Sequence, residues 1–391
     1  MVQSAWLRGD CMTSPLSGIR IVEMAGIGPG PFVGMMLADH GAEVIRIERL
    51  SKSDAVAVSV EKDVLLRSRK RIAVDLKSPE GVALVRRLVQ SADGLIEGFR
   101  PGVMERLGLG PDVLMEDNPR LVYGRMTGWG QTGSLASAAG HDINYIALSG
   151  ALHAFGRAGE KPYPPLNVVG DFGGGSMMLA FGMLAALLHV QRGGQGQVVD
   201  CAVTDGSALL MAMFLGMQAD GLWNSQRGTN LLDGGAHFYD SYETADGKWI
   251  AVGSIEPQFY ALLREKAGLS TDPDFDGQMD TGRWSALKDK LAAVFRTKTR
   301  DQWCALMEGS DVCFAPVLDF EEAAAHPHNA ERNVYVRVGG VLQPAPAPRY
   351  SAAETVAPRM AAGGGDAGAL LAGLGYDAHQ AEKLLNSGVV S

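Results

Sequence analysis

Short apolar runs in the first third of the chain are separated by helix-like stretches, a pattern that predicts strands alternating with helices. Buried parallel strands are expected at the apolar runs 19–24, 44–47, 72–76, 94–97 and 121–126. Helices are expected at 31–40, which begins with a proline, and at 79–90, which follows Ser78 as a cap. This alternation implies βαβ units with right-handed crossovers and therefore a mainly parallel sheet.

The pattern changes in the second half of the chain. The sequence Ala245-Asp246-Gly247 separates two strand-like runs and predicts a β-hairpin, because Asp-Gly favours tight hairpin turns. The expected elements are a helix at 177–191, a strand at 198–203, a helix at 205–220, strands at 238–244 and 248–253, helices at 257–267 and 283–297, an extended segment at 334–350 and a helical segment at 367–386.

These elements predict an α/β fold with two domains, since 391 residues exceed what a single core usually serves. We expect a large domain with a mainly parallel sheet and flanking helices over 12–225. A smaller α+β domain should follow over 235–330, after a glycine-rich crossing. Residues 331–391 should return as an extended segment with C-terminal helices that completes the large domain. Residues 1–11 are interpreted as an extension before Met12.

Composition narrows the class of protein. Hydrophobic residues at 46% and charged residues at 20% are typical of a soluble globular protein. The net charge of −9 argues against a general nucleic-acid binder, although a local basic cluster could still bind a small anion. The longest apolar run, 177–188, is shorter than the roughly 20 residues that span a bilayer, so we expect no membrane insertion.

The four cysteines are scattered, with no CxxC pair and no histidines at metal-binding spacing. This usage favours a reduced, cytoplasmic compartment and predicts no metal site. The N-terminal residues lack the apolar core of a secretory signal, and the final residues SGVVS are not a peroxisomal tripeptide. We therefore expect a cytoplasmic protein.

A glycine-rich loop at 26–31, GIGPGP, follows the first expected strand and precedes a helix. With Glu48 about twenty residues further on, it is similar to a dinucleotide-binding fingerprint. The third glycine of that fingerprint is replaced by Pro31, and Pro29 removes an N–H that could face a pyrophosphate. We interpret the loop as a tight turn beside an active site rather than as a nicotinamide or flavin site.

Candidate chemistry is concentrated between Gly140 and Gly175. This stretch holds His141 and Asp142, and a second aspartate, Asp171, directly before three glycines. Two titratable groups joined by a short connection suit acid–base catalysis. Each residue also has a plainer interpretation: His141 as a structural histidine, Asp142 as a helix cap, and Asp171 as the cap of a helix over 173–191.

From about Pro15 to Tyr350 the chain resembles the α-methylacyl-CoA racemases, a branch of the family III CoA-transferases, or CaiB/BaiF superfamily. The matching segments are GIGPGP (26–31), VIRIER (44–49), VDLKS (74–78), RPGVMERLGLGP (100–111), RMTGWGQTG (125–133), GHDINY (140–145), PPLNVVGDFGGGS (164–176) and AVGSIEPQFY (251–260). The racemase branch is indicated mainly by GHDINY and AVGSIEPQF.

The resemblance implies a racemase or epimerase that interconverts the two C2 epimers of 2-methylacyl-CoA thioesters through an enolate. It implies His141 and Asp171 as the two bases, Glu256 as the carboxylate that orients the histidine, and the Asp142 backbone N–H as a donor to the enolate oxygen. No metal or organic cofactor is expected, because coenzyme A enters as part of the substrate.

The resemblance also implies an interlocked homodimer and a set of contacts to the acyl-CoA substrate. The implied substrate contacts are Arg49, Val74, Lys77, Gly98, Arg106, Gly140, Asp142, Asn144 and Tyr145. Two alternatives stay open. The first is a CoA-transferase that uses Asp171 as a nucleophile, for which a second proton-transfer group such as His141 would be superfluous. The second is a non-catalytic protein that binds coenzyme A.

Overall fold

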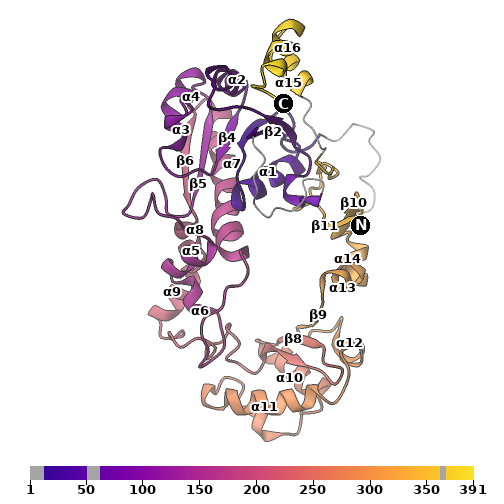
Figure 1. Cartoon of the computed structure of the whole chain (residues 1–391). Helices are drawn as coiled ribbons and strands as arrows, with labels where there is room; N and C mark the ends of the chain where they lie inside the picture. The colour runs from indigo at the N-terminus through magenta and orange to yellow at the C-terminus, as the bar shows by residue number, and fades with distance from the viewer. Residues whose placement is uncertain (1–12, 51–61, 362–366) are drawn as a thin grey trace. The chain divides into compact units, whose positions relative to one another are not determined.

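The computed structural model describes residues 13–50, 62–361 and 367–391 (Figure 1). The chain divides into two compact units. Unit 1 comprises the chain up to Ile146, Asn167–Leu210 and Asn333–Ser391, and unit 2 comprises Ala147–Leu166 and Met211–Arg332. The extension predicted for residues 1–11 lies outside the described residues.

Unit 1 contains a six-stranded parallel sheet with the strand order β3-β2-β1-β4-β5-β6. Its strands are β1 (Arg20–Met24), β2 (Glu43–Glu48), β3 (Lys70–Ala73), β4 (Gly94–Glu97), β5 (Val122–Thr127) and β6 (Gln197–Ala202). The predicted α/β class is confirmed. The order reverses direction between β1 and β4, and in sheets of this type ligands bind outside the carboxyl ends of the strands at that point.

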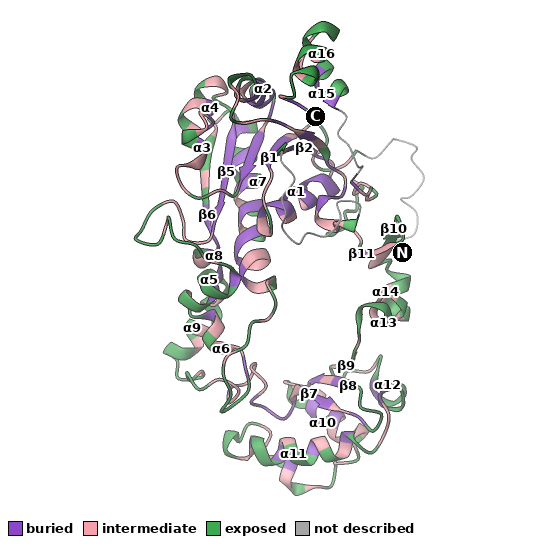
Figure 2. Cartoon of the chain, viewed as in Figure 1, coloured by how far each residue is buried: buried purple, intermediate pink, exposed green. Residues whose placement is uncertain are grey.

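Helices cover both faces of the sheet, and Figure 2 shows its central strands β1, β2, β4 and β5 as mainly buried. On β1, Val22 packs with one hydrophobic cluster and its neighbour Ile21 with another, because successive side chains of a strand point to opposite faces. The first cluster includes Leu84 of α2, and the second includes Leu37 of α1 and Leu179 of α7. The helices of unit 1 are α1 (Pro29–Asp39), α2 (Pro79–Gln90), α3 (Val103–Arg106), α4 (Pro111–Asp117), α5 (Asp142–Leu148), α7 (Met178–Gln191), α8 (Val203–Leu210), α15 (Ala367–Gly373) and α16 (Ala378–Asn386), with the 3₁₀ turn η2 (Val64–Leu66).

The helix expected at 177–191 begins earlier, because a π-helix, η3 (Val168–Met177), precedes α7. Asp171 lies inside η3, so the interpretation of Asp171 as a helix cap is wrong. Glycines let η3 pack closely: a Cβ built on Gly206 of α8 would lie 1.8 Å from the carbonyl oxygen of Gly174. Among the described residues, Val168–Gln191 is the one helical stretch long and apolar enough to cross a membrane, and half of its most apolar part is buried inside the protein.

Unit 2 is built on a three-stranded antiparallel sheet of order β7-β8-β9, and the predicted hairpin forms its first pair. The core is aromatic and includes Phe238, Phe295 and Trp303, each completely buried. The elements of unit 2 are α6 (Ala151–Ala154), α9 (Ala212–Ala219), β7 (Tyr239–Glu243), β8 (Trp249–Gly253), α10 (Pro257–Lys266), η4 (Pro273–Asp276), η5 (Thr281–Arg283), α11 (Trp284–Phe295), α12 (Arg300–Met307), β9 (Phe314–Val317), α13 (Phe320–Ala325) and α14 (Pro327–Glu331).

Two boundaries differ from the prediction. Residues 147–166 and 211–225, expected in the large domain, belong to unit 2. Long-range contacts place these residues in unit 2, for example the ion pair between Arg157 and Asp240, whose Nη1 and Oδ1 atoms lie 2.6 Å apart.

Two expected elements also differ in the structure. The helix expected at 205–220 is two helices, α8 and α9. The extended segment at 334–350 contains an antiparallel pair in unit 1, β10 (Tyr335–Val338) and β11 (Val341–Pro344).

Candidate active site

A cavity of about 620 Å³ lies in unit 1 at the carboxyl ends of the central strands. Its walls come from the loops that follow β1, β4 and β5, together with the start of α5 and η3. The lining includes Ile27, Gly28, Gly98, Phe99, Arg100, Gly128, Trp129, Gly140, His141, Tyr145, Asn167 and Asp171. This is the position at which an open parallel sheet with this strand order binds its ligand.

Asp171 reaches the cavity from η3 and is partly buried. Asn167, one turn earlier, donates a hydrogen bond from Nδ2 to Asp171 Oδ2 over 3.3 Å. Burial raises the pKa of the Asp171 carboxyl, and the negative charge of Asp142 adds to this rise. The hydrogen bond from Asn167 and the nearby His141 act in the opposite direction. A carboxyl whose pKa is raised exchanges protons more readily near neutral pH.

The GIGPGP loop forms the turn opposite Asp171, as predicted. Gly28 has φ of 70°, in the left-handed region that favours glycine. A Cβ built on Gly28 would lie 3.2 Å from Asp171 Oδ2, so the turn is in close contact with the carboxylate. The place that a dinucleotide phosphate occupies in related sheets is therefore filled by an acidic side chain of the protein, which argues against an anion at that point.

His141 lines the same cavity, immediately before α5, and its side chain is exposed. Asn144 fixes the backbone there, because its Oδ1 accepts the His141 N–H over 3.1 Å. Asp142 is buried, and its Oδ1 accepts the Asp171 N–H over 2.6 Å. The Asp142 side chain therefore caps η3 and connects the backbones of the two candidate bases. Burial raises the pKa of the Asp142 carboxyl, against the hydrogen bonds from the N–H groups of Asp171 and Gly170.

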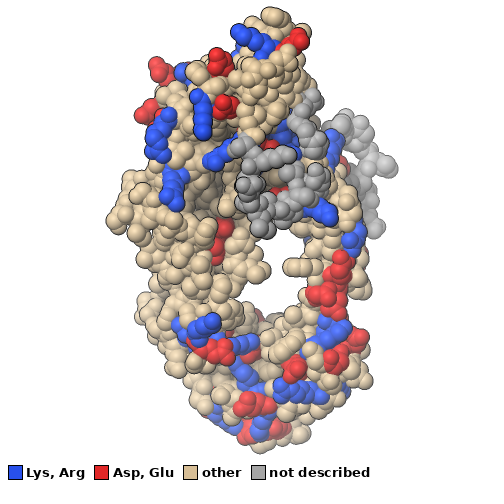
Figure 3. All heavy atoms as spheres, in the orientation of Figure 1, with Lys and Arg blue, Asp and Glu red and all other residues tan. Residues whose placement is uncertain are grey.

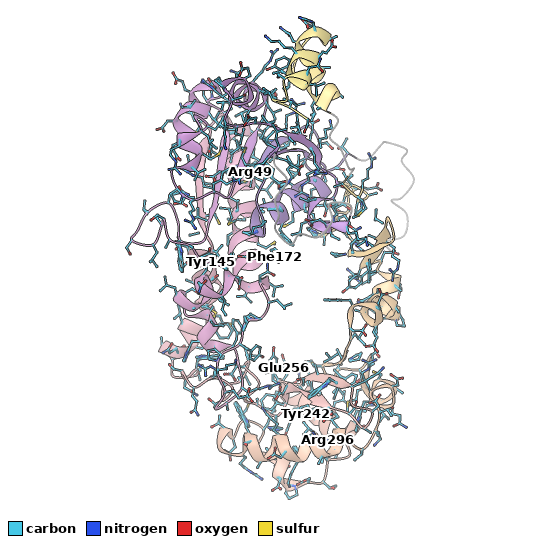
Figure 4. The ribbon with its side chains drawn as sticks, viewed as in Figure 1. Arg49, Tyr145, Phe172, Tyr242, Glu256 and Arg296 are labelled. Carbon is cyan, nitrogen blue, oxygen red and sulfur yellow. The ribbon has the colours of Figure 1, made fainter. Side chains whose placement is uncertain are left out.

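Tyr145 and Trp129 form an aromatic wall of the cavity. Their rings meet edge to face with centroids 4.8 Å apart, and the Tyr145 hydroxyl donates to the Gly140 carbonyl oxygen. A Cβ on Gly128 would lie 2.0 Å from the Tyr145 ring, so the wall requires glycine at 128. Figure 4 labels Tyr145 in α5 and Phe172, the residue after Asp171, in η3.

The residues predicted to contact coenzyme A occupy several places in unit 1. Gly98 lines the cavity of Asp171, whereas Lys77 and Arg106 line a second depression with Arg86 and Arg87. Figure 3 shows Lys and Arg side chains in this region, over α2 to α4. The Arg49 guanidinium lies 5.9 Å from the centroid of the Phe99 ring, and Phe99 lines the cavity.

Val74 and Glu256 differ from the other predicted site residues. The Val74 side chain is buried in the core, and the Val74 N–H donates to the Glu48 carbonyl oxygen over 2.9 Å. The predicted contact of Val74 with coenzyme A stays a prediction. Glu256 is exposed in unit 2, directly before α10 (Figure 4). Its role toward His141 stays a prediction.

Sequence reasoning missed the contributions of Asn167, Trp129 and Phe99. Asn167 could have been found from its spacing, because it precedes Asp171 by four residues and so lies on the same side of a helix. Trp129 and Phe99 each follow an expected strand, at the end of the sheet where ligands bind. Within the ranges that the structure describes, no group of three or more His, Cys, Asp or Glu side chains could hold a metal ion.

The protein is thus an α/β protein in which a histidine and an aspartate line one cavity. This cavity lies where the strand order of the sheet reverses, between β1 and β4. The chain belongs to the CoA-transferase family III, whose profile matches residues 16–362. The resemblance inferred from the motifs is therefore confirmed.

Two of the most similar relatives belong to the racemase branch of this family. The chain is 49% identical over 337 residues to "Alpha-methylacyl-CoA racemase" of Mus musculus, covering 86% of both chains. It is 48% identical over 321 residues to the protein of the same name from Homo sapiens, covering 82% of both. A CAIB/BAIF family protein from Brucella suis has a similar solved structure, with a TM-score of 0.79, 25% identity, and coverage of 93% of this chain and 100% of that one.

Proposed function

We propose that this protein interconverts the two C2 epimers of 2-methylacyl-CoA thioesters, with His141 and Asp171 as the two proton-transfer groups. The main support for this proposal is that both side chains line one cavity. Burial at this cavity raises the pKa of the Asp171 carboxyl. The proposal is also supported by relatives that are almost half identical in sequence and are named alpha-methylacyl-CoA racemase.

The reaction removes the C2 proton from one face of the thioester and returns a proton to the other. One group begins as a base and the other as an acid, and their roles exchange when the reaction runs backwards. Two groups with unequal environments suit this exchange: His141 is exposed at the cavity, and Asp171 is partly buried. Asp142 would hold them in register, since its side chain accepts the Asp171 N–H and its backbone follows His141.

The enolate is the energetic difficulty of this reaction. A thioester α-proton is less acidic than imidazolium by about ten or more pKa units, each worth about 1.4 kcal/mol. A preorganised N–H aimed at the developing oxyanion supplies about 3–4 kcal/mol of this. We assign this role to the Asp142 N–H, which opens α5 and so has no carbonyl of a preceding turn to bond. The thioester carbonyl accepts the electron pair, so the proposed chemistry needs no metal or organic cofactor.

The coenzyme A portion carries phosphates, which suit arginine and lysine side chains. Lys77 and Arg106 share one depression of unit 1 with Arg86 and Arg87, and Arg100 lines the cavity of Asp171. We propose that Arg49, Lys77 and Arg106 bind the phosphates, with Gly98, Gly140, Asn144 and Tyr145 around the thioester.

Proton exchange in heavy water tests the proposal. One pure C2 epimer of a 2-methylacyl-CoA is supplied without any acceptor acid, and deuterium at C2 and stereochemistry are followed together. Uptake of deuterium with inversion is the expected result. If no exchange occurs but coenzyme A moves to an added carboxylic acid, the protein is a transferase with Asp171 as nucleophile. In that case His141→Ala should leave the transfer rate unchanged.

We also propose a homodimer, as the family resemblance implies. Large apolar side chains are exposed within each unit, including Phe181 of α7 at 73% and Leu215 of α9 at 62%. On α7, Phe181, Leu184 and Leu188 are exposed at spacings of three and four residues, so they share one face of the helix, and grouped exposed apolar side chains mark association sites. Sedimentation equilibrium should give twice the chain mass, and a monomer at micromolar concentration would contradict this assignment.

A further inference from the structure

Glu23 is a carboxylate that the proposed chemistry does not use, yet it is completely buried. It lies on β1, and its two oxygens bind two arginines. Arg46 Nη1 donates to Oε1, and Arg69 Nε donates to Oε2 over 3.1 Å. Gly34 of α1 leaves room for this group, because a Cβ there would lie 2.5 Å from Glu23 Oε2.

Each arginine also donates one hydrogen bond to the GIGPGP turn. Their other donors bind elsewhere, Arg46 Nε to Glu48 Oε1 over 3.3 Å and Arg69 Nη1 to the Arg67 carbonyl oxygen over 3.0 Å. Arg46 Nη2 donates to the Gly26 carbonyl oxygen over 3.1 Å, and Arg69 Nη2 donates to the carbonyl oxygen of Pro31. Both ends of the turn are therefore held by carbonyl groups. Carbonyl oxygens are the groups of the turn that a guanidinium can bind, because it donates hydrogen bonds and accepts none.

The turn held in this way is the one that contacts Asp171. Gly28, in the middle of the turn, lies against the Asp171 carboxylate. The Pro29 carbonyl oxygen accepts a hydrogen bond from Ser176 Oγ of η3 over 2.9 Å. The Phe32 ring stacks on that of Phe172, with centroids 4.6 Å apart. Two contacts thus join the turn to the segment that carries Asp171, and Phe32, the next residue of α1, adds a third.

Stability alone is a poor reason for such a buried ionic group. Removing carboxylate and guanidinium groups from water costs several kcal/mol per ion, and apolar residues of similar volume are often as stabilising. What an ion pair adds is orientation, since a guanidinium held by one carboxylate presents its other N–H groups in fixed directions. Those directions point here at the two ends of the turn.

We propose that Glu23 is a positioning residue for Asp171. Through Arg46 and Arg69 it fixes the turn that shapes one side of the Asp171 carboxylate and keeps water from it. This inference rests on the proposed racemase function. It predicts that loss of the Glu23 charge disturbs the step carried by Asp171 more than the step carried by His141.

The test compares Glu23→Gln with Asp39→Asn. Asp39 of α1 is a matched control, since it is buried and binds Arg67 through Nε and Nη2 over 3.0 and 2.5 Å. Arg67 then donates to Gln343 and Pro344 instead of the turn. Both variants are expected to lower the melting temperature. Deuterium uptake is measured from each pure epimer, because uptake from one epimer and from the other depends on different bases.

For Glu23→Gln we expect kcat for exchange to fall about tenfold or more, since misplacement by about 1 Å has large effects on rate. The ratio of the two exchange rates should change by about threefold or more, whereas Asp39→Asn should leave that ratio within about twofold. Burial is the main cause of the raised pKa of Asp171. Asn167 and His141 lower this pKa, and the charge of Asp142 raises it. Water admitted by a loosened turn should therefore move the Asp171 limb of the pH profile to lower pH.

A second variant covers the case in which Glu23→Gln does not fold. Ser176→Ala removes the hydroxyl that lies between the carbonyl oxygens of Pro29 and Asp171, at 2.9 and 3.0 Å. It should change the epimer ratio in the same direction with a smaller loss of rate. Equal ratios in Glu23→Gln, Asp39→Asn and the unchanged protein would overturn the positioning role. Absence of exchange in the unchanged protein would instead overturn the proposed function, so the two failures are distinguishable.

Discussion

The two units of this protein treat a titratable side chain in opposite ways. In unit 1, His141 is exposed at a cavity with Asp171, where protons can be exchanged with a ligand. In unit 2, His237 is completely buried and is packed against the rings of Phe238, Tyr260 and Phe275. Burial lowers the pKa of His237 to about 4. The same residue type therefore lies on a cavity, where we propose that it serves chemistry, in one unit and inside the core of the other.

The difference lies in solvent access and in partners. His237 Nε2 lies 2.7 Å from the Tyr260 hydroxyl, so one ring nitrogen is paired inside a dry aromatic core. A neutral imidazole is favoured there, because the core cannot solvate a charge. Asp171 keeps one side on a cavity, from which a ligand or solvent can reach its carboxyl group. The function of a histidine or an aspartate therefore cannot be assigned from its residue type alone, without knowledge of its surroundings.

The largest effect that separates the two regions should come from Asp171→Asn. The amide has nearly the same shape but cannot accept the proton, so exchange at C2 should fall by about 10²–10⁴-fold for the epimer that needs this base. Deuterium uptake from each epimer measures the loss. The melting temperature serves as the control and should be almost unchanged. Full exchange activity in this variant would exclude Asp171 from proton transfer.

The second effect concerns stability in acid and should belong to unit 2. The pKa of His237 is about 4 in the folded chain, below the usual value of 6.5. The unfolded state therefore binds a proton first as the pH falls, and the free energy of unfolding should decrease between pH 6.5 and pH 4 by about 3 kcal/mol. Urea unfolding followed by tryptophan fluorescence at several pH values measures this slope.

Removing the buried imidazole should flatten that slope. His237→Leu is suitable because the Tyr260 hydroxyl also lies 3.1 Å from the Phe275 carbonyl oxygen and so keeps a partner. His141→Ala is the matched control: it should abolish exchange from one epimer but leave the acid slope as it is. An unaltered slope in His237→Leu would show that other groups cause the loss of stability in acid.

The smallest effect should come from Asn167→Leu, which tests the surroundings of Asp171 alone. The Asn167 hydrogen bond favours the charged carboxylate, so its removal should raise the pKa of Asp171 further. The basic form is then lost at a higher pH as the solution is acidified, and the acid limb of the exchange profile should move upward. Exchange at neutral pH should fall roughly two- to tenfold, as expected for one hydrogen bond. A limb that moves to lower pH would contradict the assignment of that limb to Asp171.

Much of the fold could be predicted because local patterns carry it. The central strands β1, β2, β4 and β5 are almost entirely buried and so read as largely apolar runs. Ser78 caps α2 as its position predicts, accepting the Gly81 N–H over 2.9 Å. The motifs GHDINY and VGDFGGG indicated His141 and Asp171 as candidate bases through the family resemblance, and the structure places both on one cavity. Asp246-Gly247 identified the hairpin of unit 2, because the turn depends on two adjacent residues.

What the sequence alone could not decide is which distant residues meet. Asp142 accepts the N–H of a residue 29 positions later, and Glu23 binds arginines 23 and 46 positions later. Neither periodicity nor composition reports such pairs, because they form only when the strands and η3 come together. The same applies to segment 147–166, which joined unit 2 through contacts such as Arg157 with Asp240. Local preferences therefore determined the elements and the reactive residue types, whereas long-range packing decided the environment of each carboxylate and histidine, and with it the protonation that the proposed chemistry requires.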